Sequence, residues 1–103
     1  MQLIMSGRGM VLTPSFKALV ERKLAKLARL GPRILDARVV CAVEKFRRTV
    51  RLTLRARRRT FSAAATAGDL LAAVDSAVGT LSRQVSEEKR RRRARLHSPP
   101  RVA

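Results

Sequence analysis

The residue types that most often carry out catalysis are scarce in this chain. His97 is the only histidine, and it precedes a Ser-Pro-Pro segment where no rigid acid–base partner is expected. Cys41 is the only cysteine, and without an evident neighbouring base it is better interpreted as a small buried apolar group than as a nucleophile. One cysteine and one histidine cannot form a structural zinc site. We therefore expect a protein that is not an enzyme, with no catalytic residues, no metal and no cofactor.

Basic side chains are the chemistry that remains. The 103 residues include 24 Lys or Arg and 7 Asp or Glu, which gives a formal net charge of +17. A charged surface that serves only solubility usually mixes both signs. An excess of one sign repels itself and is relieved by a polyanion, most commonly nucleic acid in the cytosol. Residues 45–59 carry eight basic residues and no acidic one, and residues 89–95 carry six. The sequence therefore predicts a nucleic-acid partner.

Each of these basic clusters has two interpretations. The arginines within residues 49–57 either form a solvated outer face of a sheet or contact RNA directly. The run at residues 89–95 either extends a helix into solvent or frays into a basic tail, and such tails also bind nucleic acid. The aromatic residues are Phe16, Phe46 and Phe61 alone, which argues against a stacking platform for single strands.

Length and composition indicate one cytoplasmic domain. A hydrophobic content of 46% is ordinary for a globular domain, and a single cysteine requires no oxidising compartment. No apolar run approaches the roughly 20 residues of a membrane helix, and the N-terminus has no secretory signal pattern. We expect a domain over residues 1–95, a short disordered tail over residues 96–103, and no membrane association.

The first predicted helix starts at Thr13, whose hydroxyl suits an N-cap, followed by Pro14. Apolar residues then recur at helical spacing until Gly31-Pro32 ends the pattern. Lys26 and Arg29 face away from this apolar stripe. Lys23 falls within the stripe, so its stem is expected to pack while its ammonium reaches water.

The second predicted helix opens with Asp69 as its N-cap and keeps an apolar face to about residue 86. Between the helices, residues 37–43, 49–57 and 61–67 read as strands, and residues 2–8 form a first strand. The order predicts an α+β fold, β-α-β-β-β-α, with a four-stranded mixed sheet and two helices on one face. This architecture is similar to that of the double-stranded-RNA-binding domain.

Several motifs follow one another in a recognisable order. The chain opens with Met-Gln-Leu-x-x-x-Gly-Arg, continues with Lys23-Leu24-Ala25-Lys26-Leu27 and Val43-Glu44-Lys45, and ends with Asp69-Leu70-Leu71-Ala72-Ala73-Val74-Asp75 and Leu81-Ser82-Arg83-Gln84-Val85. Together they closely resemble the ribosome hibernation-promoting factors, also called ribosome-associated translation inhibitors, over residues 1 to about 90. The resemblance is to the short form. Longer members add a dimerising C-terminal domain, so we expect no ribosome dimerisation by that route.

The resemblance implies a function. Members of this family bind the small ribosomal subunit and its rRNA, within the 70S ribosome, during starvation stress or stationary phase. They occupy the channel for mRNA and tRNA and sterically block the A and P sites, which inhibits translation. The same resemblance implies a protein that is a monomer off the ribosome. Two alternatives stay open, namely a general basic RNA- or DNA-binding or ribosomal structural protein, and a protein-binding sigma-factor modulator.

The resemblance also implies which residues bind RNA, because helix-borne basic residues contact rRNA in the family. Members usually carry a tyrosine where Leu71 stands, and a lysine where Thr80 and Glu87 stand. The contact surface is therefore expected to shift toward the C-terminal end of the second helix. The expected RNA-binding residues are Lys23, Lys26, Arg29, Arg83, Lys89, Arg90, Arg91 and Arg92.

Overall fold

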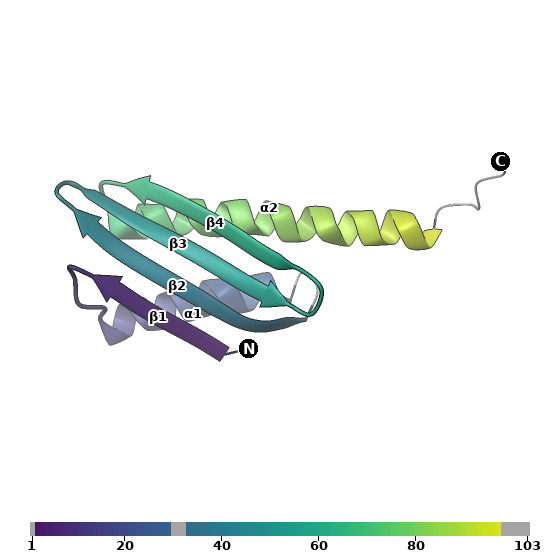
Figure 1. Cartoon of the computed structure of the whole chain (residues 1–103), viewed down its shortest axis with the longest axis horizontal. Coiled ribbons are helices and arrows are strands. Elements are labelled where there is room, and N and C mark those ends of the chain that lie inside the picture. The colour runs from purple at the N-terminus through teal and green to yellow at the C-terminus, as the bar shows by residue number, and fades with distance from the viewer. Residues whose placement is uncertain (1, 30–32, 98–103) are drawn as a thin grey trace.

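The predicted order of elements is confirmed by the computed structural model (Figure 1). The structure describes residues 2–29 and 33–97, with the backbone alone for residues 95–97. Its elements are β1 (Gln2–Arg8), α1 (Pro14–Ala28), β2 (Ile34–Glu44), β3 (Arg47–Ala56), β4 (Thr60–Ala67) and α2 (Leu70–His97). Within the described residues, neither helix is long and apolar enough to cross a membrane.

The four strands form one mixed sheet in the order β1-β2-β3-β4. β1 runs parallel to β2, whereas β2, β3 and β4 are antiparallel to their neighbours, as predicted. β2 extends beyond the predicted residues 37–43 at both ends, and β3 starts two residues before the predicted 49, because backbone pairing runs from Ile34 opposite Ala56 to Glu44 opposite Arg47. Polar residues at the end of a hairpin do not show the apolar alternation that identifies a strand in the sequence. The opposite charges of Glu44 and Arg47 nevertheless favour pairing of the two strands there.

Alternating strand residues point to one face of the sheet, and both helices cover that face (Figure 1). Every buried side chain among those that the structure describes is apolar, and Phe61 of β4 is the largest of them. The inward residues of β4 beyond it are alanines, such as Ala63, whose small side chains let α2 pack closely on β4. The buried strand residues are Ile34, Ala37, Val39, Cys41, Val50, Leu52, Leu54, Ala56, Phe61 and Ala63.

α1 begins as predicted. The Thr13 hydroxyl accepts a hydrogen bond from the Phe16 backbone N–H at 3.2 Å, and a proline occupies the first turn. The helix buries Val20, Leu24 and Leu27, which lie on one stripe. The predicted end at Gly31-Pro32 lies outside the described residues.

α2 begins at the predicted cap, since Asp69 Oδ1 accepts from the Leu71 backbone N–H at 3.1 Å. Val85 is its last fully buried residue, yet the helix continues to His97, so the basic run extends the helix rather than fraying. With 28 residues α2 is about 42 Å long, and it projects beyond the sheet (Figure 1). We call residues 86–97 the α2 extension. It includes the first two residues of the predicted tail, and residues 98–103 lie outside the described residues.

Candidate nucleic-acid interface

Both helices present basic side chains on their solvent-facing sides. Lys26 of α1 and Arg29, the residue that caps its C-terminus, are exposed, and the Arg29 backbone N–H donates to the Lys26 carbonyl at 3.3 Å. Arg83 of α2 is exposed as well. Because both helices lie on the same face of the sheet, these three cations belong to one layer of the molecule.

Lys23 differs from the other predicted RNA-binding residues of α1. Its Nζ lies 2.6 Å from Oδ1 of Asp75, an ion pair that joins α1 to α2. The Lys23 side chain is 30% exposed, in agreement with a packed stem and an ammonium near the surface. The ammonium is therefore engaged with a carboxylate, so any phosphate must compete with Asp75 for it.

Arg83 is held in place by Thr80. The Arg83 Nη2 donates to Thr80 Oγ1 at 3.4 Å, and Thr80 Oγ1 donates in turn to the Ser76 carbonyl at 3.2 Å. Thr80 thus carries no charge itself and contributes to this surface by positioning Arg83. Arg83 also lines a shallow pocket of about 490 Å³ on the surface of α2. The other residues that line this pocket are Ser82, Ser86, Glu87 and Arg90.

The α2 extension carries a run of cations that are all exposed, namely Lys89, Arg90, Arg91, Arg92 and Arg93. Glu87 lies 3.8 Å from the Arg90 guanidinium and 4.0 Å from that of Arg91, which supports the helix through pairs three and four residues apart. Consecutive residues of a helix are about 100° apart, so the five side chains point around the whole circumference. A single flat partner surface contacts only some of them.

The strand arginines lie on the sheet face opposite the helices. Arg38 and Arg51 are exposed there, whereas the Arg55 Nε donates to Asp36 Oδ2 at 2.7 Å. Their exposure agrees with both interpretations of these residues, the solvated outer face and direct RNA contact. Phe46 is 87% exposed at the tip of the β2–β3 hairpin, and Phe61 is buried, so the described rings form no stacking platform.

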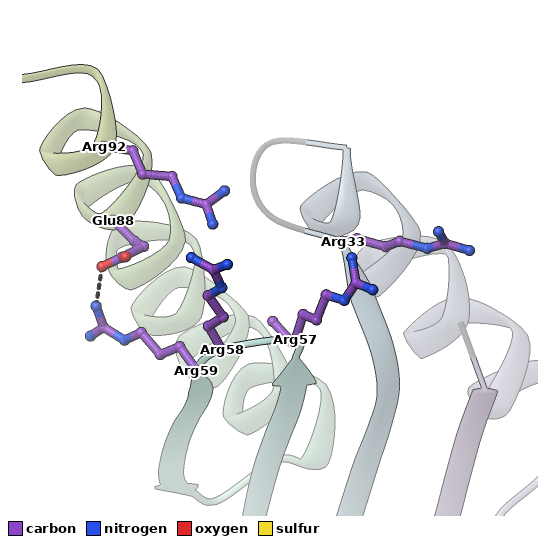
Figure 2. Close-up of a pocket in the computed structure, with 7 residues that line it drawn as sticks. Arg33, Arg57, Arg58, Arg59, Glu88 and Arg92 are labelled. Atoms are coloured by element: carbon purple, nitrogen blue, oxygen red, sulfur yellow. Dashed lines mark hydrogen bonds and ion pairs between the residues drawn. The ribbon is translucent and has the colours of Figure 1, made fainter. Parts of the chain in front are cut away.

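A second cationic feature, which the sequence-based assignment missed, lies where α2 leaves the end of the sheet (Figure 2). It is a pocket of about 500 Å³ lined by the charged residues Arg33, Arg57, Arg58, Arg59, Glu88 and Arg92. We call it the arginine pocket. Of these residues, only Arg92 is among the predicted RNA-binding residues. The sequence does show three consecutive arginines in the short link between two predicted strands. That these arginines line one pocket with Arg92 depends on tertiary structure, which the sequence pattern does not give.

Cys41 is fully buried in β2, as predicted for a small apolar group. Desolvation by burial raises the pKa of its thiol above the ordinary value, because the thiolate is disfavoured in the core. A thiol with a raised pKa and no access to solvent is a poor nucleophile.

Known proteins similar to this chain fall into one group. The family model described as Sigma 54 modulation protein / S30EA ribosomal protein matches residues 3–93. The Ribosome hibernation promoting factor of Escherichia coli K12 is 34% identical over 89 residues, which cover 86% of this chain and 94% of that protein. The protein of the same name from Azotobacter vinelandii is 32% identical, with 86% of this chain and 83% of that protein covered.

Two solved structures share the fold. A ribosomal subunit interface protein from Coxiella burnetii has a TM-score of 0.76 at 26% identity, covering 86% of this chain and 98% of that chain. The N-terminal domain of Protein Y from Thermus thermophilus has a TM-score of 0.78 at 26% identity, covering 85% and 99%. The resemblance predicted from the motifs is thereby confirmed. Since the family model matches most of its length, the chain belongs to the Sigma 54 modulation protein / S30EA ribosomal protein family.

Proposed function

We propose that this protein is a cytoplasmic ribosome hibernation factor that inhibits translation without catalysis. It binds the small subunit within the 70S ribosome, in the channel for mRNA and tRNA, and its bulk blocks the A and P sites. The observation that carries the proposal is the layer of exposed cations on α1 and α2, in a domain whose relatives are named ribosome hibernation promoting factors.

The physical basis is contact between these cations and rRNA phosphates. Guanidinium and ammonium groups on rigid helices bind phosphates without reading base sequence, so the shape of the site on the ribosome supplies specificity. Lys26, Arg29 and Arg83 are exposed and have no acidic partner within the described residues. They are therefore the primary contacts, and the cations at residues 89–92 extend the surface along α2.

The test replaces Lys26 and Arg83 by glutamate in one variant and measures its dissociation constant for vacant small subunits. The matched control, Arg38→Glu with Arg51→Glu, makes the same charge change on the opposite face of the sheet. If each helix contact is a charge-assisted hydrogen bond, we expect roughly 10- to 100-fold weaker binding per lost contact. The control is expected to retain most of the affinity, and circular dichroism checks that both variants are folded.

A second measurement addresses the blockade. Saturating protein is expected to prevent binding of mRNA and initiator tRNA to small subunits, and to stop peptide synthesis in a cell extract. Equal affinity for vacant subunits and for random duplex DNA would instead favour a general nucleic-acid-binding protein. A protein partner retained after nuclease treatment, without ribosome binding, would favour the sigma-factor modulator. Either result contradicts the proposed function.

A further inference from the structure

The arginine pocket concentrates like charge in one place. Five arginines and one glutamate line it, which gives a formal charge of +4 around an open space of about 500 Å³. The Arg59 guanidinium forms an ion pair with Glu88 and lies over the Phe61 ring, 4.9 Å from its centroid. Glu88 is thus engaged on the outer side of the pocket, and the remaining four arginines carry the uncompensated charge.

Three of these arginines, Arg57, Arg58 and Arg92, line the open space with side chains that are not engaged by an acid (Figure 2). The side chains of Arg58 and Arg92 point toward one another across it, and Arg57 extends from the same turn toward the start of β2. Among the residues that the structure describes, none of the three has an ion pair or a side-chain hydrogen bond. Cations that face each other without an intervening acid repel, and a bound anion removes that repulsion.

The backbone that carries these arginines is fixed independently of any ligand. The Ala56 N–H donates to the Arg59 carbonyl at 2.8 Å, which closes the β3–β4 turn. The Arg59–Glu88 ion pair then ties this turn to α2, one helical turn before Arg92. Because the fold already fixes the backbone that carries these arginines, anion binding requires ordering of their side chains but not of a flexible loop.

The composition of the lining identifies the class of ligand. Planar guanidinium groups bind phosphate oxygens through paired hydrogen bonds. Apart from Ala56 the lining consists of charged side chains, with no amide side chain to read a base edge and no ring for a base to stack on. The pocket therefore suits a phosphate group rather than a nucleobase.

We propose that the arginine pocket is a phosphate-binding site for the backbone of folded RNA, a contact separate from the helix-layer cations Lys26, Arg29 and Arg83. The inference rests on the proposed function, because it takes rRNA as the source of the phosphate. It extends the interface from the helix layer to the end of the sheet. The pocket residue Arg92 belongs to both surfaces, whereas Arg57 and Arg58 belong to this pocket alone.

The first experiment uses Arg57→Ala with Arg58→Ala, two exposed turn residues, and Arg38→Ala with Arg51→Ala as the control of equal charge loss. Affinity for vacant small subunits is measured between about 50 and 200 mM salt. Loss of one to two phosphate contacts is expected to weaken binding at least about tenfold. The slope of log K against log salt is expected to fall by about 1 to 2. Unchanged affinity and slope in the folded pocket variant, or an equal loss in the control, would overturn the proposal.

The second experiment needs no ribosome. Inorganic tripolyphosphate is titrated into the wild-type protein while the arginine Nε–Hε signals are followed by NMR. Saturable shifts are expected at Arg57, Arg58 and Arg92, and much weaker binding is expected in the Arg57→Ala/Arg58→Ala variant. If wild type and the variant bound tripolyphosphate equally well, the arginine pocket would not be the phosphate-binding site.

The two experiments together separate the possible failures. If tripolyphosphate binds in the pocket but the pocket variant binds small subunits as well as wild type does, the site takes a free anion and the RNA assignment is wrong. If the wild-type protein does not bind subunits at all, the proposed function fails. In that case the RNA assignment fails with it, and the tripolyphosphate titration decides alone whether the pocket binds phosphate.

Discussion

Lys23 and Asp75 join the two helices of this domain through an ion pair of 2.6 Å, on the layer that carries the proposed RNA contacts. Their side chains are 30% and 55% exposed, so water and salt screen the pair, and its contribution to stability is at most about 1 kcal/mol. The carboxylate of Asp75 also places a negative charge within the cationic layer. The pair therefore favours the contact between α1 and α2 while it reduces the availability of Lys23 to a phosphate.

The substitution Asp75→Asn separates these two effects. We expect the free energy of unfolding in urea to decrease by about 0.2–1 kcal/mol, because one exposed ion pair is lost. We expect affinity for small subunits to increase severalfold at low salt, because Lys23 is released and a repulsive charge is removed. Weaker binding by the folded variant would show that Asp75 does not compete with RNA for Lys23.

Arg59 is expected to stabilise the fold, whereas its neighbour Arg58 is not. Arg59→Ala removes an ion pair with Glu88 and a cation–π contact with Phe61, and the expected loss is about 1 kcal/mol. Arg58→Ala in the same turn removes neither contact and is expected to leave unfolding unchanged or to raise stability slightly. Urea unfolding measures both variants. Hydrogen exchange of the backbone amides after Val85 is expected to accelerate in Arg59→Ala and not in Arg58→Ala. Equal effects of the two substitutions would contradict a stabilising role that belongs to Arg59 alone.

Burial of Cys41 predicts a dependence of stability on pH. Because the folded state raises the pKa of the thiol, the unfolded chain loses this proton first as pH rises above about 8.5. The free energy of unfolding must then fall with increasing pH. Between about pH 8 and pH 10, wild type is expected to lose more stability than Cys41→Ala, which has no thiol. Parallel curves for the two proteins, measured by urea unfolding, would contradict a desolvated thiol.

The β2–β3 hairpin tip contains Lys45 with a positive φ of 51°. A side chain in this region costs about 1–2 kcal/mol, whereas glycine adopts it freely but loses more backbone entropy on folding. Lys45→Gly is therefore expected to stabilise the protein by about 0.5–1 kcal/mol. Phe46→Gly is the control, because Phe46 is exposed and its φ is not positive, so only the entropic cost applies. In thermal unfolding, we expect the melting temperature to rise for Lys45→Gly and to fall for Phe46→Gly.

The features that sequence predicted correctly depend on near neighbours. Thr13 and Asp69 cap their helices because each accepts a hydrogen bond from a residue two or three positions on. The strands follow from alternation of apolar residues, which fixes the buried face from Val50 to Ala56 without knowledge of any partner. Such signals lie within a few residues of one another, so a single sequence contains them.

The features that sequence did not predict depend on how distant segments are placed. The Lys23–Asp75 pair requires the register of α1 against α2, and periodicity gives only the face of each helix. Arg58 faces Arg92, and Arg57 lines the same pocket, because α2 continues beyond the sheet past the β3–β4 turn. The apolar stripe of α2 stops at Val85, so nothing in the hydrophobic pattern showed where the later cations would lie.

The length of α2 beyond Val85 has a further consequence. No residue from 86 to 94 is fully buried, and the ion pair between Glu88 and Arg59 ties this stretch to the β3–β4 turn. The free energy of unfolding of the sheet and its two packed helices is therefore expected to depend little on which amino acids occupy most of these positions. If the proposed RNA contacts form, substitutions of the exposed cations there are expected to change affinity with little change in melting temperature, so binding strength can vary without loss of a stable fold.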